Sequence, residues 1–400
     1  MAKSPIPAGT RDPRLDMFRG IALMMIFINH VPGQIYEQFT SRNFGHSDAA
    51  EAFVFMAGLA ATLAYGPRIA QGIRWTSIRK VWGRAWTLYL VHVFTAFWAI
   101  AIMSGAALWF GGEELLTKNA FKPLLTEPLA FLIGIPALTH QLGYVNILPM
   151  YAVLLLGAPW LIRLGQYSPR LLLAFTIGLW ALTGQFRLNL PNFPFEGGWF
   201  FNPFAWQILF SIGILTGLAL RRGERLVPVT PWLIWPAAIW LVACAFWVNF
   251  EWAMATLGHV TWQLREWGTP FYLAGFDKTF VSLPRLSHLL ALAYILSLPG
   301  VIPAFAASRY AAPFRLLGRH GLPVFAAGTI LAMLGQAIKH VHPGGFWQDT
   351  ALIFGGLALQ LLLAFAREKL APKETPAPRA SAPAPEHAAV ATPKPRLAAR

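Results

Sequence analysis

The chain has 400 residues, of which 56% are hydrophobic and only 12% are charged. That charged share is about half of what a soluble domain carries, so an ordinary soluble fold is excluded. The formal net charge of +15 comes from lysines and arginines clustered between apolar runs, without an aromatic-interleaved basic face, which argues against a nucleic-acid partner. The single cysteine, Cys244, excludes an intrachain disulfide and a Cys-ligated zinc site.

Apolar runs of about 18 residues or more recur along the chain, as in membrane-spanning helices. We predict an all-α polytopic membrane protein with ten transmembrane helices at 15–33, 48–66, 80–108, 143–162, 169–187, 203–220, 231–249, 285–303, 320–339 and 349–366. With the N-terminus inside, inner segments carry 24 lysines and arginines and outer segments carry 8. This bias follows the positive-inside rule and predicts that both termini are cytoplasmic.

Three segments between or after these helices need separate interpretations. The stretch 123–139 is apolar but broken by Pro123, Pro128 and Pro136, so we predict a re-entrant or surface segment rather than a span. Residues 250–284 form the longest predicted outer loop, whose tryptophans indicate an interfacial belt or a stacking surface for sugar rings. Residues 1–370 are predicted to form one membrane-embedded domain, and the Ala/Pro/Lys-rich stretch 371–400 a disordered cytoplasmic tail.

The first predicted helix carries an arginine near its inner end and a histidine towards its outer end. Arg19 and His30 are eleven positions apart, which places them within about 20° of the same helix face and about 16.5 Å apart along the axis. Charged or titratable side chains are expensive in hydrocarbon, so each is a functional candidate. The alternative for His30 is a buried polar residue that is bonded to a neighbour.

Glu51 begins the second predicted helix, at a depth similar to that of His30. A carboxylate bonded to one imidazole nitrogen raises the basicity of the other, as a general base requires. We therefore predict that His30 and Glu51 form a catalytic pair. The alternative is that Glu51 only stabilises the start of its helix, for which Asp48 is the better candidate.

Arginines gather on the predicted cytoplasmic side. Arg79 and Arg84 lie there with Arg19, and the apolar sequence after Arg84 predicts that this side chain lies below the membrane surface. The planar guanidinium group suits phosphate and pyrophosphate, so these three residues are candidates for binding a nucleotide-bearing donor. Most such clusters only orient the helices.

Other polar residues interrupt apolar runs and are weaker candidates for substrate binding: Asn146, Gln207, Arg285 and His288. Arg285 and His288 share a helix face near the outer surface. His340 and His342 have no carboxylate at ligand spacing, so no metal site is predicted. Phosphate-binding loops, GxGxxG, GxSxG and HExxH patterns are also missing from the sequence.

Several blocks resemble known membrane acyltransferases. RLDMFRG…NH, with Arg19 and His30, is similar to the opening of the acyltransferase-3 superfamily, and AEAFVFMAGL, with Glu51, to its second-helix block. EAFVFMAGLAATLAYG, LGYVNILPMYAVLLLGAPW, FNPFAWQILFSIGIL, DKTFVSLPRLSHLLALAY and GRHGLPVF resemble the OpgC family. The stretch from Arg79 to Arg84 is looser than the arginine-rich segment usual in the superfamily.

The resemblance implies an O-acyltransferase of the bacterial inner membrane. It would take a succinyl group from cytoplasmic succinyl-CoA to hydroxyls of periplasmic glucans, with no permanently bound cofactor, and its partners would be the bilayer, the donor and the glucan. One alternative is transfer of an acetyl or other acyl group to a different envelope polysaccharide. Another is a non-enzymatic transporter of a polar substrate, with His30 and Glu51 as a proton relay.

Overall fold

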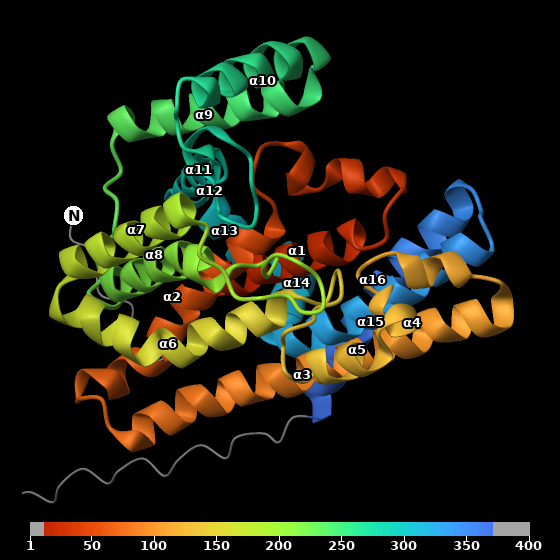
Figure 1. Cartoon of the computed structure of the whole chain (residues 1–400). Coiled ribbons are helices and arrows are strands. Elements are labelled where there is room, and N and C mark those ends of the chain that lie inside the picture. Colours follow the sequence, from red (N-terminus) through yellow and green to blue (C-terminus); the bar gives the residue numbers. More distant parts are fainter. Residues whose placement is uncertain (1–11, 371–400) are drawn as a thin grey trace, which may run out of the picture.

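A computed structural model describes residues 12–370, and within that range every regular element is a helix (Figure 1). The predicted tail 371–400 lies outside the described residues. The longer helices are α1 (Pro13–Asn29), α2 (Ala49–Ala70), α3 (Trp75–Phe110), α6 (Ile147–Tyr167), α7 (Pro169–Phe186), α8 (Pro203–Arg221), α9 (Pro231–Asn249), α10 (Glu251–Glu266), α12 (Leu283–Leu296), α15 (Gly321–Val341) and α16 (Phe346–Leu370). The short ones are α4 (Pro123–Thr126), α5 (Pro128–Gly134), α11 (Phe271–Ala274), α13 (Val301–Ala307), α14 (Ala312–Arg319), η1 (Ile35–Phe39), η2 (Ser41–Asn43), η3 (Glu113–Thr117) and η4 (Arg309–Ala311).

Seven helices of the described part are long and apolar enough to cross a membrane, namely α2, α3, α6, α8, α9, α15 and α16. The bent pair α12 and α13 gives an eighth if it counts as one span. The ranges 15–33 and 169–187 are largely helical, as α1 and α7, but α1 has only 17 residues and neither belongs to this set. The all-helical, multi-pass membrane architecture is therefore confirmed, whereas the number ten stays a prediction.

The range 285–303 does not form the single straight span that the sequence predicts. α12 ends at Leu296, and the chain bends by 74° before α13 begins at Val301. Pro299 cannot donate a backbone hydrogen bond, and Gly300 has φ +118°, a conformation that favours glycine. These two residues break the helix.

The two segments with separate predictions have different outcomes. Within 123–139 the chain forms only α4 and α5, of four and seven residues, which confirms that this stretch is not a span. The predicted loop 250–284 instead contains the 16-residue helix α10, which packs against α9 with Phe250 between them (Figure 1). Phe250 has an extended backbone, which ends one helix and lets the other begin.

The core lies around α8, which packs against α2, α6 and α7. α2 and α8 cross closely because each presents glycine to the other. A Cβ atom at Gly58 would lie only 1.9 Å from the Phe210 carbonyl oxygen, and one at Gly213 would lie 2.1 Å from the Phe55 carbonyl oxygen. Small residues at such crossings let membrane helices pack backbone to backbone. This crossing fixes the position of α2, whose N-terminus forms part of the site described below.

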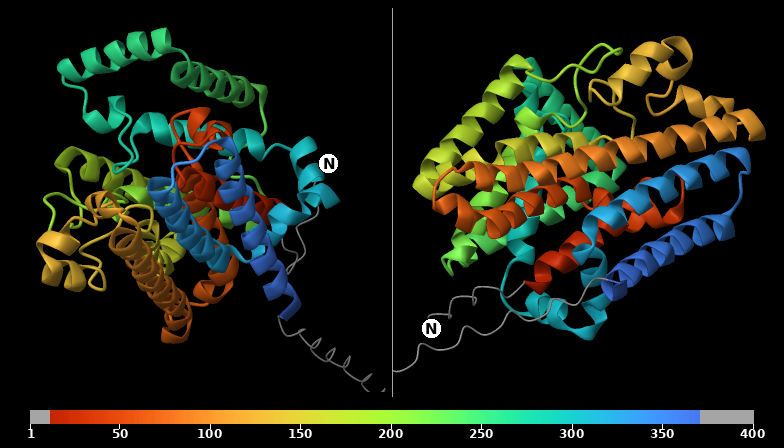
Figure 2. Two further views of the ribbon diagram at one scale, coloured as in Figure 1. Left: turned by 90° about the vertical axis from the view of Figure 1, so that its right-hand side faces the viewer. Right: turned by 90° about the horizontal axis from the view of Figure 1, so that it is seen from below.

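The beginning of α1 and the end of α16 meet the same short helix, α14. The Asp16 carbonyl oxygen packs so tightly on Gly318 that a Cβ atom there would lie 1.8 Å away. Glu368, near the end of α16, bonds His320 at 2.6 Å and Arg319 at 3.1 Å. Both ends of the described chain therefore lie at one end of the bundle, while the C-terminus of α1 points to the other (Figure 2).

This arrangement gives a topology prediction. A reporter tag inserted near Thr40, or between α9 and α12, should be accessible from the periplasm, and a tag after Leu370 should be accessible only from the cytoplasm. The reason is that inner segments carry most of the lysines and arginines. Periplasmic accessibility of the C-terminal tag would contradict the predicted orientation.

Candidate functional site

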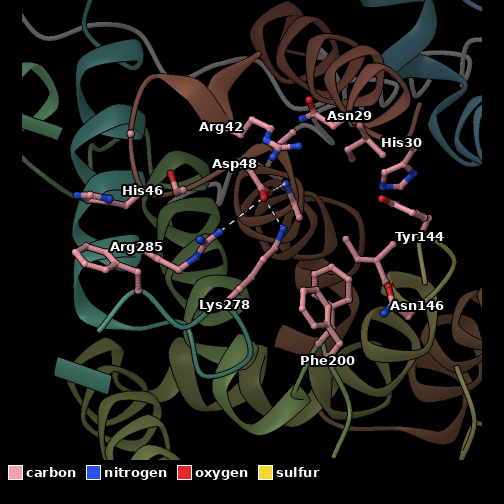
Figure 3. Close-up of a pocket in the computed structure, with 18 of the residues that line it drawn as sticks. Asn29, His30, Arg42, His46, Asp48, Tyr144, Asn146, Phe200, Lys278 and Arg285 are labelled. Carbon is pink, nitrogen blue, oxygen red and sulfur yellow. Dashed lines mark hydrogen bonds and ion pairs between the residues drawn. The ribbon is translucent and has the colours of Figure 1, made fainter. Parts of the chain in front are cut away.

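A cavity of about 730 Å³ opens where the C-terminus of α1 meets the N-terminus of α2 (Figure 3). The loop before α6, the segment before α12 and the α9–α10 pair complete its walls. The polar side chains in the wall are Asn29, His30, Arg42, His46, Ser47, Asp48, Asn119, Tyr144, Asn146, Lys278 and Arg285. The aromatic ones are Tyr144, Phe200, Phe201, Trp247, Phe276 and Phe325.

Asp48 lies at the centre of a charged cluster on one side of the cavity (Figure 3). It is the N-cap of α2: its Oδ1 accepts a 2.8 Å hydrogen bond from the Ala50 amide, and the Asp48 amide donates to Glu51 at 3.0 Å. Lys278 forms an ion pair with Asp48, and Arg285 Nε donates to Glu51 Oε1 at 2.7 Å. This arrangement joins α2 to α12 and the segment before it through two carboxylates and two cations.

His30 caps α1 on the opposite side of the cavity, where its ring faces Tyr144 (Figure 3). The two ring centroids are 4.7 Å apart at an edge-to-face angle, and Gln336 Nε2 donates to the His30 carbonyl oxygen at 2.6 Å. These contacts fix the backbone and one ring edge. Nδ1 of His30 is buried and has no hydrogen-bond partner among the described residues. A positioned imidazole with an unused nitrogen can take a proton from a bound molecule.

His46 forms part of an aromatic wall. Its ring lies 4.6 Å from that of Phe276 and 5.1 Å from that of Trp247, centroid to centroid. Burial, together with the neighbouring His288 and Arg285, lowers the pKa of His46 to about 4. His46 is therefore a neutral imidazole at neutral pH and adds to the aromatic surface rather than to the charge of the cavity.

The model of one protein family, described as OpgC protein, matches residues 11–371. The chain belongs to the OpgC family. No curated protein and no solved structure matches it significantly. Family membership supports a membrane acyltransferase, and the cavity is the candidate active site of this OpgC chain.

The predicted pairing of Glu51 with His30 is wrong. Glu51 is fully buried, and its two oxygens bond Arg285 and the Asp48 amide. The prediction relied on the similar depth of the two residues in neighbouring helices. The orientation of the Glu51 carboxylate is instead set by the capping of α2 and by a cation from α12. Any role of Glu51 in this OpgC protein therefore acts through Arg285 and Asp48.

The four candidate substrate-binding residues divide into two groups. Asn146 and Arg285 line the cavity, but Gln207 and His288 do not. Gln207 is buried between α7 and α8, where its Nε2 donates to the Thr176 carbonyl oxygen at 2.9 Å. A glutamine in an apolar helix is satisfied here by a neighbouring backbone, which is a structural role. His288 lies behind the cavity wall, where it is hydrogen-bonded to Ser47 at 2.7 Å.

The three candidate donor-binding arginines lie away from the cavity. Arg19 lies 3.7 Å from Asp16 and donates to the Gly318 carbonyl oxygen at 3.4 Å, at the end of the bundle that holds both ends of the described chain. Arg79 and Arg84 are exposed on α3, and the depth of Arg84 below the membrane surface stays a prediction. That face of α3 has no helix packed over it.

Sequence reasoning did not select several cavity residues, including Ser47, Tyr144 and Lys278. Tyr144 and Lys278 lie in loops, where no helical period marks the direction of a side chain. Asp48 had a recognisable signal as a helix cap, and that interpretation is confirmed. No group of three or more His, Cys, Asp or Glu side chains that could hold a metal ion occurs in residues 12–370.

Proposed function

We propose that this OpgC protein is an inner-membrane O-acyltransferase of the acyltransferase-3 type. It transfers a succinyl group from cytoplasmic succinyl-CoA to hydroxyls of periplasmic glucans. Family membership supports acyl transfer, and the observation that carries the site is His30, which lines a cavity of about 730 Å³ and whose ring has a nitrogen, Nδ1, without a hydrogen-bond partner among the described residues.

The walls of the cavity suit a sugar. Phe200 and Trp247 offer apolar faces for a pyranose ring, and Asn29, Asn146 and Tyr144 offer hydrogen bonds for its hydroxyls. In this proposal an acceptor hydroxyl lies against His30, which takes its proton as the oxygen attacks the acyl carbonyl. Proton removal is needed because a neutral hydroxyl is a weak nucleophile.

The donor is proposed to approach from the other end of the bundle. Arg19, Arg79 and Arg84 offer guanidinium groups there for the phosphates of CoA, while the acyl end extends towards His30. Arg19 and His30 lie on one helix about eleven residues apart, or about 16.5 Å along its axis.

The competing function is transport of a polar substrate without acyl transfer. The break between α12 and α13 favours it, because broken helices line the substrate sites of many transporters. Transfer of another acyl group, such as acetyl, to a different polysaccharide is the remaining alternative. Acyl transfer and transport differ in one requirement, because only an acyltransferase needs the thioester donor.

The test is reconstitution of the purified full chain in vesicles, with labelled succinyl-CoA on one side and periplasmic glucan on the other. Mass spectrometry should find succinyl esters on the glucan only when both the protein and the donor are present. Parallel reactions with acetyl-CoA identify the acyl group. Glucan that crosses the membrane unmodified and without donor would overturn the proposal in favour of transport.

A further inference from the structure

A serine and a histidine that the proposed reaction does not use form a close pair at the cavity wall. Ser47 precedes the N-cap of α2, lines the cavity and is 2% exposed. Its Oγ lies 2.7 Å from Nδ1 of His288, which α12 contributes from 241 residues further along the chain. A hydroxyl within hydrogen-bond reach of an imidazole is the arrangement of an activated nucleophile.

The direction of this hydrogen bond follows from a second contact. The Ser47 backbone amide also approaches Nδ1 of His288, at 3.3 Å. An amide N–H can only donate, so Nδ1 carries a lone pair and no proton. The Ser47 hydroxyl must then be the donor in the 2.7 Å bond. His288 is thus in the tautomer that can accept the hydroxyl proton of Ser47.

We propose that Ser47 is a nucleophile that carries the acyl group as an ester between donor and acceptor, with His288 as its base. This inference rests on the proposed acyltransferase function. It makes the transfer a two-step reaction, in which the donor and the acceptor need not meet.

The surroundings of Ser47 suit the negative charge that develops on a carbonyl oxygen under attack. Ser47 stands at the N-terminus of the 22-residue helix α2, the positive end of its dipole. Lys278 and Arg285 line the same wall, where Asp48 and Glu51 pair with them and hold their donor groups in place. Fixed positive groups of this kind stabilise tetrahedral intermediates.

The first step balances as follows. Ser47 Oγ forms a bond to the thioester carbonyl carbon, and its proton passes to Nδ1 of His288. The C–S bond then breaks, and the thiolate of CoA leaves and takes up a proton from water. The products are an ester on Ser47 and a protonated His288.

In the second step an acceptor hydroxyl attacks the ester carbonyl and gives its proton to His30. The bond from Ser47 Oγ to the carbonyl carbon breaks, and the serine oxygen recovers the proton from His288. His30 then releases its proton to water, which balances the one taken up by the thiolate. Each imidazole handles one proton: His30 lines the cavity, and His288 lies behind Ser47, outside the cavity lining.

The alternative is a purely structural role, in which the Ser47–His288 hydrogen bond only holds the loop before α2 against α12. Gly45 packs on the other edge of the ring, where a Cβ atom would lie 1.9 Å from Nε2 of His288, so the imidazole is held firmly on both sides. A fastening role needs the hydrogen bond alone, whereas a nucleophile must become covalently labelled. The experiment therefore looks for the ester itself.

The purified full chain is mixed with labelled succinyl-CoA in the absence of glucan, digested, and analysed by mass spectrometry. The peptide that contains Ser47 should carry one succinyl group, and added glucan should remove it. His30→Gln should retain the label but no longer pass it on, because His30 acts only in the second step. Ser47→Ala should lose the label and slow glucan succinylation about 10²–10⁴-fold, the usual contribution of base-assisted attack.

Ser282→Ala is the matched control, because Ser282 is fully buried near the start of α12 but does not line the cavity. It should keep both the label and the transfer rate. Glucan succinylation by the parental protein with an unlabelled Ser47, or a parental rate in Ser47→Ala, would overturn the inference and leave the acyltransferase function standing. No succinylated glucan and no label in any variant would instead contradict the acyltransferase function.

Discussion

A His30→Gln variant is expected to insert and fold normally but to succinylate glucans about 10²–10⁴-fold more slowly, the range that positioned general bases contribute. Glutamine keeps a hydrogen-bonding group in place of the ring that contacts Tyr144, but it cannot take a proton. The bond from Gln336 goes to the His30 backbone and survives the change. His30→Ala should be as inactive. The measurement is glucan succinylation by equal amounts of purified protein.

His140→Gln is the matched control for this loss. His140 is fully buried and, like His30, has an Nδ1 without a partner among the described residues; its other ring nitrogen is bonded to a backbone carbonyl at 2.9 Å, and it lies outside the cavity. A loss of transfer that is equal in both variants would mean that buried imidazoles support the fold, and that His30 is not the base.

Replacing Arg285 with methionine is expected to destabilise the folded protein strongly. The Arg285 side chain is only 12% exposed and holds Glu51, which is fully buried. Breaking a buried ion pair from one side leaves an uncompensated charge and costs about 3–5 kcal/mol. Thermal unfolding of the purified protein in detergent should show a clear loss of stability and a lower yield of inserted protein.

Two further variants distinguish the loss of the Arg285–Glu51 ion pair from the general effect on stability of removing a positive charge. Arg42→Met removes another arginine of the cavity, but its side chain is 51% exposed and lies 3.5 Å from Glu37, so its effect on unfolding should be small. Arg285→Met combined with Glu51→Gln should recover part of the lost stability. Equal destabilisation by Arg42→Met, or no recovery in the double variant, would show that Arg285 does not act through Glu51.

The sequence predicted those features that depend on periodicity and on local capping. Runs of apolar residues located a helix in each predicted range, and Asp48 was recognisable as a helix cap because capping is a contact within four residues. His30 lines a cavity, and its role as a functional residue stays a prediction. The reactions assigned to these residues remain predictions.

Contacts between distant segments could not be predicted in the same way. The sequence did not decide whether Glu51 meets His30 or Arg285, because that choice depends on how α12 packs against α2. The aromatic wall joins the loop before α2, the helix α9 and the segment before α12, and no local pattern connects these three. Helix rotation and hairpin packing are settled by the whole assembly of side chains.

Most side chains of α9 are not covered by other helices, and this affects which substitutions the protein tolerates there. Only 6% of its apolar stretch is buried within the protein, compared with 78% for α8. Substitutions in α9 that preserve hydrophobicity should be nearly neutral whatever the shape of the new side chain, because lipid tails adapt to any side-chain shape. In α8 the same swaps must match a fixed volume. Amino-acid substitutions should therefore accumulate faster in α9 than in α8, except at the α9 positions that line the cavity.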